Sequence, residues 1–120
     1  MQRTINQKIG SLGEEIACRF LIKSGYVITS RNLKVDSLEV DIIAEKSSEL
    51  TIFEIKCVAR EMIEKAYISR EMFNAASHYG LQKATNIHLA AEKLGIGRVY
   101  LLAVALSLMD GKAYVVAYEA

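Results

Sequence analysis

The sequence predicts a single α/β domain over residues 1–120, with elements in the order helix, three strands, helix, two strands. Two observations lead to this order. Apolar residues recur at helical spacing near the N-terminus and again at residues 82–94, and short apolar runs with strand character follow each of these stretches. With 120 residues and 52% hydrophobic content, the chain has enough apolar material for one core.

The first helix is predicted from an apolar stripe close to the N-terminus. The stripe consists of Ile9, Leu12, Ile16 and Phe20, flanked by Gly13, Ala17 and Leu21. Ser24 and Gly25 supply a stop signal, because glycine readily takes the backbone conformation that ends a helix. The apolar, β-branched residues 26–30 that follow are expected to form the first strand.

The middle of the chain gives one weak and one strong signal. Residues 59–79 are charged and irregular in their periodicity, so we expect a loop and a helix there. Residues 82–94 place apolar side chains on one face of a helix, and Gly95 is its predicted C-cap.

The last third of the chain predicts a hairpin. Residues 99–109 are apolar without interruption and follow two glycines, which is typical of a fully buried central strand. Asp110 and Gly111 are a turn signal, and they lead into a final strand at residues 113–118.

Two strand-like apolar runs, residues 39–44 and 50–57, are interrupted by charged side chains. Charge is costly to bury, so such placement usually indicates chemistry. A two-residue turn at Ser47 and Ser48 folds the runs into a hairpin in which paired residue numbers sum to 95. Because this turn lacks the glycine of most tight hairpins, a register shifted by one residue is the alternative.

The symmetric register sets Asp41 opposite Glu54 and Glu39 opposite Lys56, so four ionisable groups share one face. Two carboxylates with Cβ atoms about 5 Å apart repel by roughly 3 kcal/mol at an effective dielectric of ~20. A shared proton, the Lys56 ammonium or a divalent cation could offset this repulsion. Hard carboxylate oxygens suit Mg²⁺ or Mn²⁺, and Lys56 would then lie beside a metal-bound water. The alternative is a half-exposed hairpin face with ordinary cross-strand ion pairs.

The distribution of charge bears on the partner. A net charge of +1 argues against a protein whose whole surface binds nucleic acid. The charged residues among residues 1–35 are mostly basic, whereas the acidic residues of 36–54 cluster around the proposed site. A basic flank beside an acidic pocket suits a metal-dependent phosphodiesterase, although a solvated helix surface explains any single basic residue equally well.

The remaining composition bears on the compartment. Cys18 and Cys57 are too few for a disulfide framework or a zinc site, so both are interpreted as buried free thiols. The longest apolar run, residues 99–109, is shorter than the ~17 to 25 residues that span a bilayer. The N-terminus has no secretory apolar region, and we therefore expect a soluble, cytoplasmic protein without a membrane partner.

Several short motifs on these elements resemble the PD-(D/E)XK, or restriction-endonuclease-like, nucleases. The similarity is greatest to the small archaeal Holliday junction resolvases and the related bacterial family of predicted endonucleases. It is dense over residues 10–60 and thin afterwards. The motifs are Gly10-x-x-Gly13-Glu14-x-x-Ala17, Gly25-Tyr26, Arg31-Asn32, Glu39-Val-Asp-Ile-Ile-Ala44 and Phe53-Glu-Ile-Lys56.

The resemblance implies a central mixed β-sheet of about five strands flanked by helices, and a Mg²⁺-dependent endodeoxyribonuclease in which Mn²⁺ can substitute. Asp41 and Glu54 match the metal-binding carboxylates, the Ile55 carbonyl a further ligand, and Lys56 the lysine beside the attacking water. Glu14 matches a first-helix glutamate that completes the site in the resolvases. The implied substrate is DNA, with branched or junction DNA as one candidate, and the implied assembly is a homodimer.

Some assignments have local alternatives. Glu14 also fits a capping box with Ser11 at a helix start. Glu39 is either a partner of Lys56 near the site or merely its cross-strand ion pair. Three basic residues are candidate nucleic-acid contacts that could equally be exposed charges: Arg31, Lys34 and Lys83.

One departure from the family pattern keeps a rival hypothesis open. Ser37 and Leu38 precede the acidic strand where the bacterial family tends to have glycines, and a changed backbone there could shift Asp41. The rival is a catalytically silent member of the same fold that binds nucleic acid or protein.

Overall fold

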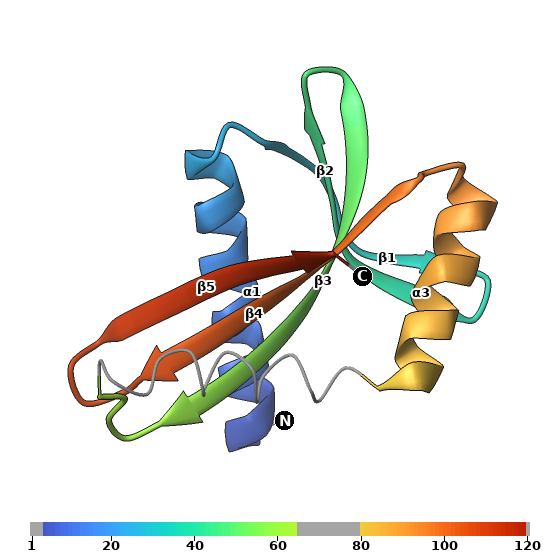
Figure 1. Ribbon diagram of the computed structural model, residues 1–120. Helices are drawn as coiled ribbons and strands as arrows, with labels where there is room; N and C mark the ends of the chain where they lie inside the picture. The colour runs from blue at the N-terminus through green and yellow to red at the C-terminus, as the bar shows by residue number, and fades with distance from the viewer. Residues whose placement is uncertain (1–3, 65–79, 120) are drawn as a thin grey trace.

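The structure is a five-stranded mixed sheet with one helix on each face, as seen in a computed structural model that describes residues 4–64 and 80–119 (Figure 1). The predicted α/β class and the order α-β-β-β-α-β-β are confirmed. The predicted helix within residues 59–79 falls mostly outside the described residues. The elements are α1 Ile5–Lys23, β1 Val27–Val35, β2 Leu38–Lys46, β3 Glu49–Arg60, α3 Leu81–Leu94, β4 Arg98–Ser107 and β5 Lys112–Glu119.

The sheet follows the chain in the order β1-β2-β3-β4-β5. All neighbouring strands are antiparallel except β3 and β4, which are parallel because the chain crosses over through α3 between them. The predicted buried central strand is β4, in which every residue from Leu101 to Ser107 is buried.

Neighbouring side chains of β3 point to opposite faces of the sheet, and a different helix covers each face. Phe53 and Ile55 belong to a cluster with Ala17 and Leu21 of α1. Ile52, the residue before Phe53, packs with Ile87 of α3 instead. The acidic hairpin is therefore held between two cores, and both helices reach its end.

Helix α1 begins earlier than its apolar stripe indicates. The Gln7 amide donates to Thr4 Oγ1 at 3.1 Å, and the Thr4 amide donates to Gln7 Oε1 at 2.9 Å, which is a capping box. Ser11 is consequently inside the helix, so the alternative that Glu14 caps its start is wrong. Glu14 is left on the third turn after the cap, where its side chain is available to the site.

The buried face of α1 is rotated from the predicted one. Leu12 is 48% exposed and Phe20 37% exposed, whereas the buried residues are Gly13, Ala17, Cys18 and Leu21. The reason is a close approach to β3: a Cβ added at Gly13 would lie 2.8 Å from Cys57 Cβ. Small residues thus decide which face packs, and the larger apolar residues lie at its margins.

The predicted hairpin register is confirmed over five pairs, from Ile42 opposite Phe53 to Lys46 opposite Glu49. Ser47 and Ser48 form the turn with φ values of 54° and 66°, the left-handed conformation required at both central positions of a type I′ turn. Serine is strained at such positions, so apolar packing on both faces of the hairpin, and not the turn residues, holds the register.

Strand β1 continues beyond the predicted residues 26–30 and includes Arg31 and Lys34. The pairing with β2 shifts between Ile28 and Ser30, which is a bulge, and Asn32 has a φ of 52°. Alternation of Leu33 and Val35 with polar residues is the strand signal in this segment. In the described part of the chain, no helix has the length and apolar character needed to cross a bilayer.

Candidate active site

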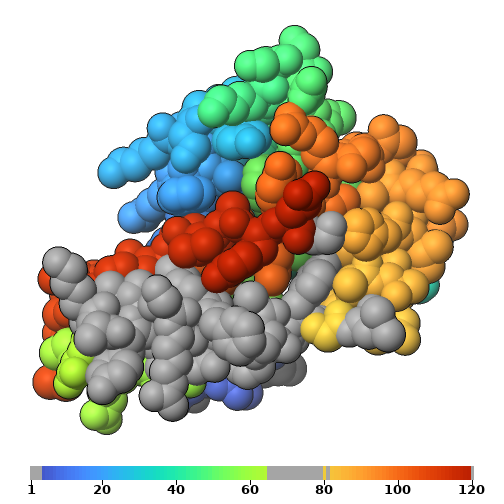
Figure 2. Space-filling model, in the orientation of Figure 1, coloured from blue at the N-terminus to red at the C-terminus, as the bar shows by residue number. Residues whose placement is uncertain are grey.

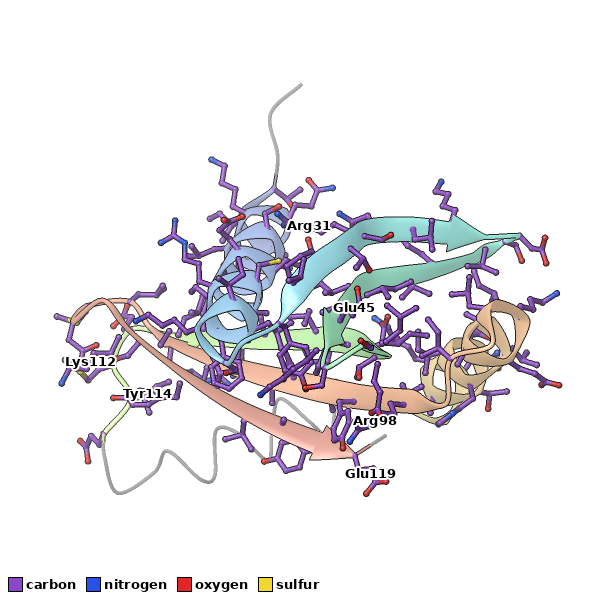
Figure 3. The ribbon with its side chains drawn as sticks, turned by 90° about the horizontal axis from the view of Figure 1, so that it is seen from above. Arg31, Glu45, Arg98, Lys112, Tyr114 and Glu119 are labelled. Carbon is purple, nitrogen blue, oxygen red and sulfur yellow. The ribbon has the colours of Figure 1, made fainter. Side chains whose placement is uncertain are left out.

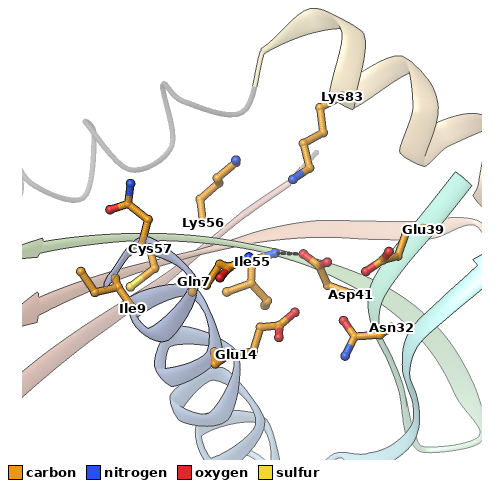
Figure 4. Close-up of a pocket in the computed structure, with 13 residues that line it drawn as sticks. Gln7, Ile9, Glu14, Asn32, Glu39, Asp41, Ile55, Lys56, Cys57 and Lys83 are labelled. Carbon is orange, nitrogen blue, oxygen red and sulfur yellow. Dashed lines mark hydrogen bonds between the residues drawn. The ribbon is translucent and has the colours of Figure 1, made fainter. Parts of the chain in front are cut away.

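Asp41 and Glu54 lie where the backbone ladder between β2 and β3 stops. The Asp41 amide donates to Glu54 Oε1 at 3.1 Å, and the Ile55 amide donates to Asp41 Oδ2 at 2.9 Å (Figure 4). Each carboxylate therefore accepts the type of hydrogen bond that a strand carbonyl accepts elsewhere in the ladder. Both side chains are held in place by rigid backbone at the mouth of the hairpin.

A pocket of about 680 Å³ opens beside this pair, and five elements contribute to its lining. Acidic groups come from α1 and β2, namely Glu14, Glu39 and Asp41, and β3 adds Ile55 and Lys56. Helix α3 contributes Lys83. Figure 4 shows Lys56 and Lys83 on one side of Asp41, with Glu14 and Asn32 on the other.

Glu54 is the most deeply buried ionisable side chain of the site, with 2% of its surface exposed. Burial, and after it the charge of Asp41, raises the pKa of its carboxyl to about 7. Its Oε2 lies 3.9 Å from Lys83 Nζ, in a second pocket of about 560 Å³ that shares Glu39 and Lys83 with the first. An ionised Glu54 thus needs a neighbouring cation, and Lys83 supplies part of that charge.

Glu14 enters the pocket from α1 and responds to the same charges. Its pKa is raised by burial first and then by the carboxylate of Asp41, while the Arg31 guanidinium opposes the rise. The close packing of Gly13 against Cys57 sets how near this part of α1 comes to β3. The helix therefore brings a further carboxylate to the edge where Asp41 lies.

Lys56 and Glu39 do not form the predicted cross-strand pair. Beyond Ile42 the β2–β3 pairing ends, and Glu39 is instead opposite Lys34 of β1. No ion pair joins Lys56 to Glu39 within residues 4–64 and 80–119. The pKa of Lys56 is lowered, chiefly by burial and then by the charge of Lys83, so its ammonium group loses a proton more readily.

The other predicted basic residues have different surroundings. Arg31 Nη1 lies 3.3 Å from Glu15 Oε2, so this guanidinium contacts α1 near the pocket. Lys34 is exposed and is not among the described residues that line the pocket. Among the described residues, Lys83 is the only one of these three candidates that lines both pockets.

Several lining residues were not anticipated from the sequence. The N-terminal half of α1 contributes Asn6, Gln7, Gly10 and Ser11, and β1 contributes Asn32. The helical residues precede Glu14 by three, four, seven and eight positions, so they share its face. That spacing is a signal in the sequence, but it becomes useful only once Glu14 is known to point into a site.

Hard oxygen ligands converge at the hairpin mouth, although not as a complete cage. Within the described ranges, no three His, Cys, Asp or Glu side chains are grouped so that they could hold a metal ion. Asp41 Oδ1 accepts no hydrogen bond from the described residues, and Ile55 lines the same pocket. Cys18 is a buried free thiol, as predicted. Cys57 packs against the core cluster but is only half-buried and also lines the pocket, so the prediction of a buried thiol is wrong for Cys57.

Comparison with known proteins places this chain in a family. The model described as "Uncharacterised protein family UPF0102" matches residues 13–104. The chain belongs to this family. The matched range includes the pocket residues Glu14, Asp41, Glu54, Lys56 and Lys83.

Individual relatives carry the name UPF0102 protein. One from Syntrophomonas wolfei is 28% identical over 112 residues, which cover 91% of this chain and 92% of the relative. One from Clostridium kluyveri is 31% identical over 91 residues, or 76% of this chain and 72% of the relative. One from Dictyoglomus thermophilum is 49% identical over 51 residues, and this match spans only 43% of that relative.

Proposed function

We propose that this UPF0102 protein is a metal-dependent endonuclease of the PD-(D/E)XK type that hydrolyses phosphodiester bonds in DNA. The observation that supports the proposal is the reciprocal arrangement of Asp41 and Glu54, with Lys56 one strand step away and facing the same pocket. Two carboxylates that repel one another beside two ammonium groups suit a cation and a phosphate bound together. Branched or junction DNA is the substrate that the resemblance favours.

The donor set fits Mg²⁺ better than a softer metal. Magnesium usually keeps several waters and takes only one or two carboxylates, together with substrate phosphate oxygens. Asp41, Glu54 and the Ile55 carbonyl would supply such a set, with Glu14 as a further carboxylate and Mn²⁺ as a substitute. When bound, the metal would lower the pKa of a coordinated water and neutralise charge on the phosphate.

The lysines would act on the water and the phosphate. Lys56, whose pKa is lowered by burial and by the charge of Lys83, would orient or deprotonate the attacking water and stabilise charge on the reacting phosphate. Lys83 would hold the same phosphate from α3 as a compact positive charge.

Cleavage assays with defined DNA substrates test the proposal. Labelled four-way junction, flap, single-stranded and linear duplex DNA would be incubated with Mg²⁺ or Mn²⁺, with Asp41→Asn and Glu54→Gln as matched variants. We expect cleavage of at least one substrate, a loss of roughly 100-fold or more in either variant, and binding that persists. Binding without cleavage under all these conditions would instead support the catalytically silent alternative.

We also propose that two copies associate through β5, the edge strand at one side of the sheet. Figure 2 shows β5 at the molecular surface, and Figure 3 shows Lys112 and Glu119 at its two ends. Between them the strand is wholly uncharged, and Val116 and Tyr118 are 37% and 36% exposed. The opposite edge, β1, is protected by a bulge and charged side chains.

Antiparallel pairing of two β5 strands is compatible with two-fold symmetry. An axis normal to the sheet at Val116 sets this residue against its own copy and Tyr114 against Tyr118 of the second copy. Such pairing would cover apolar side chains and would satisfy backbone groups of β5 that pair with no other described strand.

A further inference from the structure

Gly10 lies in the interior of α1, where glycine is unfavourable. The helix runs from Ile5 to Lys23, so Gly10 is five residues from its start and within its regular hydrogen bonding. Glycine in a helix interior is destabilising relative to alanine, because it loses more conformational freedom on folding. Its presence therefore calls for a physical reason.

Packing against the described residues, 4–64 and 80–119, does not supply the reason. A Cβ built at Gly10 meets none of their heavy atoms within 4 Å, and the residue is not among the glycines with positive φ. Gly13, one turn later, is the informative contrast, since a Cβ there would lie 2.8 Å from Cys57 Cβ. The helix thus carries one glycine that its own fold requires and one that it does not.

Gly10 lines the candidate active site, on a wall that carries the Glu14 carboxylate and otherwise no charged side chain. Its pocket neighbours on this wall are Asn6, Gln7 and Ser11 of α1, together with Asn32 of β1. The opposite side carries Lys56 and Lys83 (Figure 4). One pocket therefore presents ammonium groups on one side of Asp41. On the other side, beside the Glu14 carboxylate, it presents amide and hydroxyl groups with bare helix backbone.

These two sides suit the two parts of a nucleotide. Ammonium groups attract phosphate, whereas amide and hydroxyl side chains can both donate to and accept from sugar and base atoms. Helix backbone without a side chain allows a flat or bulky group to approach closely. A phosphate held by Lys56 and Lys83 leaves the adjoining sugar and base to extend toward α1.

We propose that Gly10 marks a nucleotide-binding surface, where the sugar and base next to the reacting phosphate pack against α1, with Asn6 and Asn32 as hydrogen-bonding partners. The proposal rests on the proposed function, because it concerns the same pocket and the same DNA strand. It assigns recognition of the uncharged part of the substrate to the first helix, and phosphate binding to β3 and α3.

Substitutions at Gly10 test this surface without disturbing the core. Gly10→Phe places a bulky side chain in the open space of the pocket, and Leu12→Phe adds a similar ring on α1 outside it. Affinity would be measured with labelled single-stranded, duplex and junction DNA, and circular dichroism would confirm that each variant folds.

We expect Gly10→Phe to weaken DNA binding by about 5- to 150-fold, the range corresponding to loss of one well-contacted base, while Leu12→Phe binds like the native protein. Replacing single nucleotides by abasic residues should weaken the native protein at one position near the cut and should have little further effect in Gly10→Phe. Unchanged affinity in a folded Gly10→Phe variant would overturn the proposal. If the native protein still cleaves DNA, the proposed endonuclease function would stand without it. If the native protein binds none of these DNAs, the proposed function and this surface both fail.

Discussion

Asp41 and Glu54 hold one another in place through the backbone. The Asp41 amide donates to the Glu54 carboxylate, and the Asp41 carboxylate accepts from the amide of Ile55, the residue after Glu54. Two like charges are thereby fixed at a short separation that electrostatics alone would oppose. The charge of Asp41 contributes to the raised pKa of Glu54, so stability and any metal affinity depend on the same pair.

The first prediction concerns stability against pH. Glu54 has a pKa of about 7 in the folded protein against an ordinary value of 4.5. Between these values the folded state retains a proton that the unfolded state has lost, so the protein should become more stable as pH falls from above 7 toward 4.5. The gain should be on the order of 3 kcal/mol, measured by denaturant unfolding at several pH values.

Glu54→Gln is the matched control for this effect. The amide oxygen of glutamine can still accept from the Asp41 amide, but it carries no charge. The variant should therefore be more stable than the native protein at pH 8 and should lose most of the slope between pH 4.5 and 7. An unaltered slope would assign the pH dependence to other groups, such as Glu14.

The second prediction uses one substitution at two positions of α1. Gly13→Ala should lower the free energy of unfolding by roughly 1–3 kcal/mol, because its Cβ would overlap Cys57. Gly10→Ala should raise it by about 0.5–1 kcal/mol, because it improves helix propensity without a clash. Thermal and urea unfolding of both variants would measure the difference. Equal effects at the two positions would contradict the close approach of α1 to β3.

The third prediction concerns Lys83, whose charge acts on two groups of the site. It lowers the pKa of Glu54 and also lowers the pKa of Lys56. Lys83→Met should raise both pKa values, which NMR titration of the Glu54 carboxyl carbon and the Lys56 side chain would detect. If Lys56 acts as a base, the cleavage optimum should also move to higher pH.

Lys34→Met provides the control, because Lys34 is exposed and lies away from the pocket lining. Its removal changes the net charge by the same amount but should leave both titrations where they are. Equal shifts in the two variants would mean that overall charge, and not proximity of Lys83, is responsible.

The sequence was sufficient to predict the hairpin register but not its end. A turn at Ser47 and Ser48 sets Ile42 against Phe53, and a slip by one residue would exchange side chains between the two apolar clusters that cover the hairpin. Beyond Ile42, hydrogen bonds to the site carboxylates take the place of the backbone hydrogen bonds between β2 and β3. Glu39 remains paired with β1, opposite Lys34. Such a divergence depends on tertiary contacts with both helices, and periodicity contains no information about it.

Helix α1 shows a second limit of sequence reasoning. Thr4 and Gln7 form the capping box ahead of the apolar stripe, so a start inferred from apolar residues is too late. The buried face of the helix is the one that contains Gly13 and Ala17, and such small residues contribute least to a pattern of apolar periodicity. Glu14 was predicted for the site by resemblance, whereas Gly10, quoted in the same motif, was given no role there, and its position in the pocket lining comes from the structure.

The last prediction concerns association through β5. Val116→Lys places a charge at the centre of β5, the edge strand of the described sheet, and in a two-fold pairing the two lysines would face each other directly. We expect the native protein to form dimers whose population rises with concentration, and the variant to remain monomeric, as measured by light scattering after size exclusion. Leu108→Lys makes the same kind of change, from an apolar to a charged side chain, at an exposed turn outside β5. This variant should dimerise like the native protein. Dimers that persist in Val116→Lys would move the interface to another surface, and a native protein that is monomeric throughout would remove the pairing altogether.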